Sequence, residues 1–106
     1  MPIQFINLKE FEPEETDIIT DISGHYHDKL KIKIPKFLLK IHIKKQKKAG
    51  NRKKFSSHLR LETPNIIAVS ESHDWDLVRT LHDCFKKLQR EVSHKFKLEG
   101  HLPKPK

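Results

Sequence analysis

Two segments near the middle of the chain alternate between apolar and polar residues. Residues 37–44 carry apolar side chains at every second position, and residues 55–62 follow the same rule with a serine in one of the apolar places. Because successive side chains of a strand point to opposite faces of its sheet, each segment is predicted to be a strand with one buried face. Gly50 and Asn51 between them form a turn signal, so the two strands are expected to make a long hairpin.

Two shorter segments predict the remaining strands. In residues 2–9, Ile3 and Phe5 alternate with polar neighbours, which indicates a short strand. Residues 66–71 begin with a run of apolar residues that directly follows a Pro-Asn turn signal. We expect this segment to be the third strand of the sheet that the hairpin starts.

Two other segments place apolar residues three or four positions apart, which is the spacing of one helix face. Pro13 suits the first turn of the first helix, whose stripe consists of Ile18, Ile19, Ile22, Tyr26 and Leu30. The stripe of the second helix consists of Leu77, Leu81, Phe85, Leu88, Val92 and Phe96. Ser72 or Asp74 is expected to cap the second helix. Gly24 destabilises the first helix by up to about 1 kcal/mol relative to alanine. We expect that a glycine is present there because the helix packs closely on the sheet.

The order of these elements, β-α-β-β-β-α, defines an α+β fold. It predicts a four-stranded sheet with two helices packed on one face, a sandwich like that of double-stranded-RNA-binding domains. Residues 1–99 are expected to form this single domain, and residues 100–106 a flexible basic tail. The shared core is predicted to contain Leu39, Ile41, Ile43, Leu59, Leu61, Leu81, Phe85 and Leu88.

The composition narrows the classes of function. The chain has 106 residues, one cysteine and three glycines, and 34% of its residues are charged. One cysteine excludes an internal disulfide, and three scattered glycines exclude a GxGxxG or Walker loop. We therefore expect no cofactor, no small-molecule substrate and no enzymatic activity. Since there is no apolar run of roughly 18 residues and no secretory signal, a cytoplasmic protein without a membrane partner is expected.

The positive charge is concentrated in one part of the chain. Residues 31–60 contain twelve Lys and Arg residues and no acid, whereas residues 1–30 contain two basic and seven acidic residues. Such a local excess of positive charge predicts a polyanionic partner, namely RNA, DNA or an anionic membrane surface. The alternative interpretation is a solvated surface that keeps the protein soluble.

Basic residues gather on two predicted surfaces, which we take as candidate RNA-binding sites. Lys and Arg side chains neutralise phosphates and give affinity without sequence specificity. The hairpin contributes Lys44, Lys45, Lys47, Lys48, Arg52, Lys53 and Lys54. The polar stripe of the second helix consists of Arg79, His82, Lys86, Arg90, His94 and Lys97, and its RNA-binding candidates are Arg79, Lys86, Arg90 and Lys97. This stripe is equally compatible with the ordinary charged face of an amphipathic helix.

Other chemically active residues receive simpler interpretations. His42 and His58 share the exposed face of the hairpin and are expected to be cross-strand neighbours, but they lack the further ligands that a metal site needs. Cys84 lies beside the apolar stripe and is interpreted as a small buried residue rather than a nucleophile. Trp75 is either an anchor over the sheet edge or a residue that stacks on a base.

Three stretches resemble the bacterial ribosome hibernation factors, namely hibernation promoting factor and ribosome-associated inhibitor A. The first helix of that family is similar to Thr16-Asp-Ile-Ile with Ile22 and Lys29-Leu30. Its second helix is similar to Asp76-Leu-Val-Arg-Thr-Leu81 with Phe85 and Lys87-Leu88-Gln-Arg90. The strand before that helix resembles Ile67-Ala-Val-Ser-Glu71. The resemblance covers about residues 2–98, and the chain looks like a short form without the C-terminal dimerisation domain of long members.

The resemblance implies a function in translation. Members of that family bind rRNA in the decoding region of the small ribosomal subunit, over the mRNA channel and the tRNA sites, and so block translation. The positions of this chain that match their RNA-binding surface are Arg79, Lys86, Lys87 and Arg90. The hairpin lysines have no clean counterpart in the family and rest on the charge argument alone.

Two other RNA-binding classes stay open as alternatives, a general RNA-binding module and a ribosome assembly factor. A double-stranded-RNA-binding domain is disfavoured, because its second helix usually opens with a lysine cluster. The corresponding segment here, residues 72–76, contains two acids that would repel phosphates. The resemblance therefore favours a hibernation factor whose partners are rRNA and the small ribosomal subunit, with the other two classes as alternatives.

Overall fold

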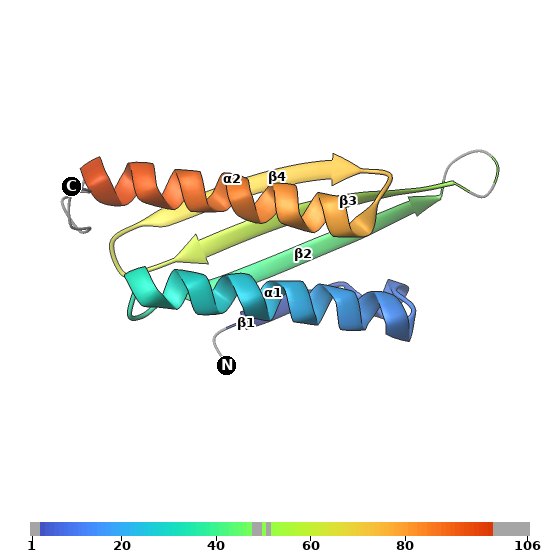
Figure 1. Cartoon of the computed structure of the whole chain (residues 1–106), viewed down its shortest axis with the longest axis horizontal. Coiled ribbons are helices and arrows are strands. Elements are labelled where there is room, and N and C mark those ends of the chain that lie inside the picture. Colours follow the sequence, from blue (N-terminus) through green and yellow to red (C-terminus); the bar gives the residue numbers. More distant parts are fainter. Residues whose placement is uncertain (1–2, 48–49, 51, 99–106) are drawn as a thin grey trace.

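The chain folds into an α+β sandwich, described by a computed structural model for residues 3–47, 50 and 52–98 (Figure 1). For residues 96–98 only the backbone is described. In order, the elements are β1 (Ile3–Ile6), the short 3-10 helix η1 (Leu8–Glu10), α1 (Pro13–Lys33), β2 (Leu38–Lys47), β3 (Lys53–Glu62), β4 (Ile67–Asp74) and α2 (Leu77–Leu98). The predicted order β-α-β-β-β-α is confirmed, with η1 added after β1. Lys48 and the predicted tail 100–106 lie outside the described residues.

Within the described residues, four strands form one sheet in the order β1-β2-β3-β4. β1 runs parallel to β2, and α1 makes the crossover between them, whereas β3 is antiparallel to both β2 and β4. In the hairpin, Leu39 lies opposite Leu61 and Ile41 lies opposite Leu59. Both helices cover the same face of the sheet (Figure 1), so one set of alternate strand positions meets them.

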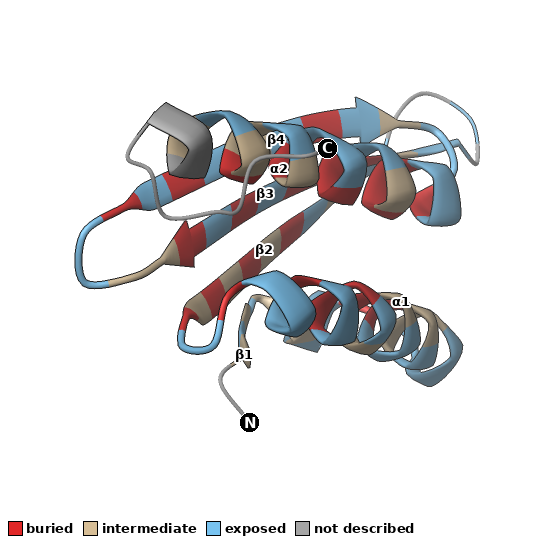
Figure 2. Ribbon diagram, turned by 60° about the vertical axis from the view of Figure 1, so that its left-hand side comes forward, coloured by how far each residue is buried: buried red, intermediate tan, exposed pale blue. Residues whose placement is uncertain are grey.

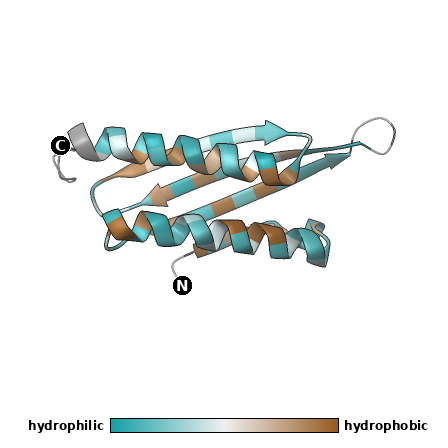
Figure 3. Ribbon diagram, in the orientation of Figure 1, coloured by the Kyte–Doolittle hydropathy of each residue, from teal (hydrophilic) through white to brown (hydrophobic). Residues whose placement is uncertain are grey.

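Apolar side chains from both layers fill the space between the sheet and the helices. All the predicted core residues are buried, and Leu39 and Phe85 have no exposed surface. Buried positions alternate along β2 and β3 but recur every three or four residues along α2 (Figure 2). The hydropathy of the residues along β2 and β3 alternates in the same way (Figure 3). The two periodicities read from the sequence therefore correspond to the two layers of one core.

Local side chains fix both ends of α1. Pro13 occupies the first turn, where its missing N–H is not needed. The backbone N–H of Glu12 donates to Oε1 of Glu15 at 2.9 Å, which is the reciprocal half of a capping box. In the last turn, Lys31 and Lys33 complement the negative end of the helix dipole.

Gly24 in the middle of α1 is not a site of close packing. A Cβ atom at this position would meet no atom outside its own stretch of helix within 4 Å. The expectation that packing on the sheet explains this glycine is therefore wrong. Gly24 therefore retains the backbone entropy cost of a glycine within a helix.

The start of α2 differs from the prediction. β4 extends through both predicted caps to Asp74, and Ser72 is a buried strand residue rather than a helix cap. The cap is Asp76, whose Oδ1 accepts the backbone N–H of Val78 at 2.9 Å. Its carbonyl accepts the N–H of Thr80, which is the first hydrogen bond of the helix. The prediction failed because three residues suited to capping occur within five positions.

β4 is the strand at one edge of the sheet, and two lysines of α2 reach its backbone. Nζ of Lys87 donates to the carbonyl of Glu71 at 3.2 Å, and Nζ of Lys95 donates to the carbonyl of Ile67 at 2.7 Å. Among the described residues, β4 has no strand neighbour on the side away from β3. The ammonium groups therefore provide hydrogen bonds that an edge strand lacks.

Candidate nucleic-acid interface

The β2–β3 hairpin carries the first candidate surface beyond the end of the helix layer (Figure 1). Gly50 has a φ of 73°, a left-handed conformation that suits glycine in the turn. The side chains of Lys44, Lys47, Arg52 and Lys53 are exposed on this segment. The hairpin that the sequence predicted is therefore present, and it presents basic side chains to solvent.

Lys47 and Lys53 are directly opposite each other across the hairpin. Like charges in a cross-strand pair repel and destabilise the ladder. Among the described residues, neither lysine forms an ion pair with an acid within 4.0 Å. An anionic ligand between them would relieve this repulsion.

Lys45, another predicted RNA-binding residue, has a partner within the protein. Its Nζ donates to Oε1 of Glu15 at 2.8 Å and lies 5.0 Å from the centre of the Phe11 ring. The side chains of Lys45 and Glu15 are only 9% and 18% exposed. Burial raises the pKa of Glu15, but the hydrogen bonds from Lys45 and from the N–H of Glu12 outweigh it and hold the pKa below its usual value. Lys45 therefore attaches the base of the hairpin to α1.

Trp75 lies between β4 and α2, beside the basic hairpin. The Arg52 guanidinium is 4.2 Å from the centre of the indole ring, and Nζ of Lys54 is 5.8 Å from it. Both distances are within the range of cation–π attraction. Trp75 is 45% exposed, so part of its ring is accessible to solvent. The structure thus brings two predicted RNA-binding cations and an aromatic surface together.

The solvent side of α2 carries the second candidate surface. Arg79, Lys86 and Arg90 are exposed at spacings of seven and four residues, which align them along about 16 Å of one helix face. A shallow depression on this side is lined by Lys86, Gln89, Arg90, Ser93 and His94. Such a mixture of cations, amide and hydroxyl groups is suited to phosphates and sugars. The Lys97 side chain lies outside the described residues.

Two residues of the predicted helix surface face elsewhere. His82 turns toward α1, where its Nδ1 lies 2.7 Å from the phenolic oxygen of Tyr26, so it does not belong to the exposed stripe. Lys87 donates to the edge of β4, as described above. The helix surface that is free to meet a ligand is therefore centred on Arg79, Lys86 and Arg90.

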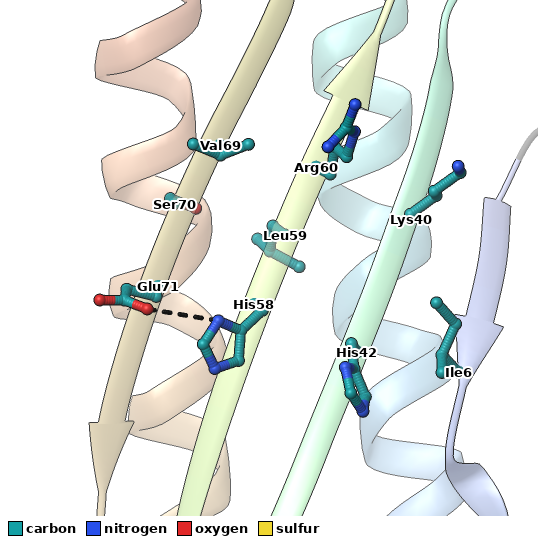
Figure 4. Close-up of a pocket in the computed structure, with 9 residues that line it drawn as sticks. All are labelled: Ile6, Lys40, His42, His58, Leu59, Arg60, Val69, Ser70 and Glu71. Carbon is teal, nitrogen blue, oxygen red and sulfur yellow. Dashed lines mark ion pairs between the residues drawn. The ribbon is translucent and has the colours of Figure 1, made fainter.

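The outer face of the sheet contains a groove that crosses all four strands (Figure 4). His42 and His58 are cross-strand neighbours there, as predicted, and their ring centres are 6.3 Å apart. Nδ1 of His58 lies 3.3 Å from Oε2 of Glu71. Burial, together with the charges of Lys44 and His58, lowers the pKa of His42.

Lys40 and Arg60 line the same groove, and the sequence analysis did not select them. They face each other across β2 and β3, and both contact the carboxylate of Glu62, at 3.1 and 3.2 Å. Their alternation with buried residues was the signal that placed them on the outer face. Because one acid lies between them, this groove is less positive than the hairpin.

Three further findings concern metal binding, membrane-spanning helices and the reactivity of Cys84. No group of three His, Cys, Asp or Glu side chains in them is arranged to hold a metal ion. Neither described helix is long and apolar enough to cross a membrane. Cys84 is fully buried as predicted, burial raises the pKa of its thiol, and Sγ donates to the carbonyl of Ser57 at 3.4 Å. A protonated, inaccessible thiol is a poor nucleophile.

Comparisons of the sequence with protein-family models and with curated proteins found no match. The choice among functions therefore rests on the charged surfaces, on the fold and on the sequence resemblance described above.

Proposed function

We propose that this protein is a ribosome-associated translation inhibitor of the hibernation type. It binds rRNA in the decoding region of the small ribosomal subunit and there excludes mRNA and tRNA. The observation that carries the proposal is the pair of facing lysines, Lys47 and Lys53, on an exposed hairpin where neither forms an ion pair with a described acid. A folded chain retains such a repulsive pair at a cost, which a polyanionic partner offsets.

The distribution of acids gives the bound protein an orientation. The first half of α1 exposes Glu14, Asp17 and Asp21, which repel phosphates. The hairpin and the solvent side of α2 carry the exposed cations. We therefore expect these two surfaces to face the rRNA and the first half of α1 to point away from it.

Inhibition by this protein requires occupancy and no catalysis. A domain that fills the space of mRNA or tRNA competes with them by mass action, so inhibition is stoichiometric with ribosomes and reversible. Initiation complexes that form beforehand protect the ribosome for the same reason. The sequence resemblance to hibernation factors supports the decoding region as the place of binding.

The experiment is a cell-free translation reaction titrated with the protein, with tRNA binding to the small subunit measured in parallel. We expect inhibition to saturate near one protein per ribosome. The double variant Arg79→Glu, Arg90→Glu should fold normally, because both side chains are exposed, and should lose inhibition. The matched control Lys31→Glu, Lys33→Glu has the same change in net charge on exposed residues of α1 and should retain it.

Two results would overturn the proposal. One is translation that continues unchanged at several-fold molar excess of protein over ribosomes. The other is binding to the small subunit without displacement of mRNA or tRNA, which would favour an assembly factor instead. Equal loss of inhibition in the control variant would overturn the assignment of the α2 surface.

A further inference from the structure

Trp75 is an exposed aromatic residue at the place where the hairpin and α2 come together. It is 45% exposed, and the segment on either side of it is held by β4 and by the first turn of α2. An exposed indole on a fixed backbone presents a rigid flat surface. Unpaired nucleobases stack on such surfaces with little dependence on sequence.

Two cations of the hairpin lie against this indole. The guanidinium of Arg52 lies 4.2 Å from the ring centre, and Nζ of Lys54 lies 5.8 Å from it. These contacts join a residue before α2 to the arm that carries the phosphate-binding candidates Lys47 and Lys53. A nucleic-acid strand that follows the arm would therefore pass the indole.

The flat face of Trp75 suits a base rather than a phosphate. Oδ1 of Asp74 accepts the backbone N–H of Asp76 at 3.1 Å, and Oδ1 of Asp76 accepts the N–H of Val78 at 2.9 Å. Both carboxylates are thus turned to the backbone at the start of α2, whereas Arg52 and Lys54 are the cations that contact the ring. The uncharged face of a base can stack on the indole while cations of the hairpin meet the phosphates on either side of it.

We propose that Trp75, contacted by Arg52, stacks on one unpaired base of single-stranded RNA while Lys47 and Lys53 hold the neighbouring phosphates. The inference rests on the proposed function, and it specifies that the partner strand is unpaired where it crosses the hairpin. A duplex offers phosphates to the lysines but keeps the faces of its bases inside the stack. The site therefore discriminates single strands from duplexes.

Trp75 is the only tryptophan of the chain, so its fluorescence reports on this site alone. The protein is titrated with a short oligouridylate and, separately, with an RNA duplex that has the same number of phosphates. We expect the single strand to quench the fluorescence and the duplex to leave it nearly unchanged. Binding of the single strand without quenching would overturn the proposal.

Two variants separate stacking from general apolar contact. Trp75→Leu keeps an apolar side chain without a π-face, whereas Trp75→Phe keeps a smaller π-face. With a labelled oligouridylate, Trp75→Leu should bind about 5- to 100-fold more weakly, and Trp75→Phe should fall between it and the wild type. The salt dependence should be the same in all three proteins, because the phosphate contacts are retained. Wild-type affinity in Trp75→Leu would overturn the proposal.

Binding to purified small subunits, measured with the same variants, distinguishes this inference from the proposed function. If the subunits bind tightly and Trp75→Leu binds them and the oligouridylate like the wild type, the stacking site is refuted and the proposed function stands. If oligouridylate quenches Trp75 but the subunits do not bind, the stacking site stands and the ribosomal function is refuted.

Discussion

The phenolic oxygen of Tyr26 and Nδ1 of His82 share a hydrogen bond of 2.7 Å between α1 and α2. The ring of Tyr26 also stacks on Phe85, with ring centres 4.7 Å apart and planes inclined by 1°. Tyr26 therefore joins the two helices through a polar and an apolar contact on the same side chain. Burial and the nearby charge of Asp83 raise the pKa of Tyr26, so the phenol stays protonated at neutral pH.

Removal of the Tyr26 hydroxyl should reveal the contribution of this hydrogen bond. Tyr26→Phe keeps the ring stack and should lower the free energy of unfolding by about 0.5–1.5 kcal/mol. Because His82→Ala removes the same hydrogen bond, the double variant should lose less than the sum of the two single variants. Urea unfolding of the four proteins measures this coupling. Strictly additive losses would show that the hydrogen bond does not contribute.

Acid should weaken the attachment of the hairpin to α1. The pKa of Glu15 is lowered in the folded protein, so its contribution to stability is complete above the usual value of 4.5 and is lost as the pH falls through the lowered pKa. At neutral pH, Glu15→Gln should cost about 1–2 kcal/mol. The difference from the wild type should shrink between pH 5 and the acid limit of folding, which thermal melts at several pH values can follow. Glu14→Gln changes an exposed acid of the same helix turn and is the control, with little expected effect at either pH.

Replacement of Gly24 should stabilise the protein. Gly24→Ala adds a methyl group where no atom outside the local helix lies within 4 Å, and it lowers the entropy of the unfolded chain. We expect a gain of about 0.5–1 kcal/mol in the free energy of unfolding. Gly50→Ala is the contrasting variant, since the φ of 73° at that turn should make the same substitution destabilising. A destabilised Gly24→Ala would contradict the open space described around this residue.

The facing lysines should account for part of the salt dependence of RNA binding. In the variant Lys47→Gln, Lys53→Gln, the slope of log affinity against log salt should decrease by about 1.4–1.8, since each phosphate contact contributes about 0.7–0.9. The free energy of unfolding should increase slightly, because the variant lacks the repulsion between the two lysines across the hairpin. Lys31→Gln, Lys33→Gln removes two charges from α1 and should leave the slope unchanged. An unchanged slope in the hairpin variant would contradict its role.

The fold could be predicted because apolar residues recur at strand or helix spacing within the main elements. Leu39, Ile41 and Ile43 alternate in β2, and Leu81, Phe85 and Leu88 recur at helical spacing in α2. The end of β4 could not be predicted from the sequence, because its inward positions Ser70 and Ser72 are polar and interrupt the apolar alternation. Tertiary contacts hold these polar positions in the strand, including the hydrogen bond that Ser70 Oγ donates to the carbonyl of Cys84 at 2.9 Å.

The candidate site could be predicted only as a set of charges. The sequence places Lys45 among other hairpin lysines, and nothing local shows that Glu15, thirty residues earlier, will pair with it. His82 likewise falls on the polar stripe of α2 by its spacing, but α1 packs beside that stripe and binds the imidazole. Which cations remain available to a ligand is a property of the packed helices, so it needed the structure.

The lysines on the edge of β4 affect how copies of this protein behave at high concentration. A second chain that docked its own strand against β4 would have to displace the ammonium groups of Lys87 and Lys95 from the carbonyls of Glu71 and Ile67. It would also bring its backbone N–H groups toward two positive charges. These two contacts therefore oppose growth of the sheet from molecule to molecule on this side. Acetylation of these lysines would remove the charge and weaken both contacts, leaving the edge less protected.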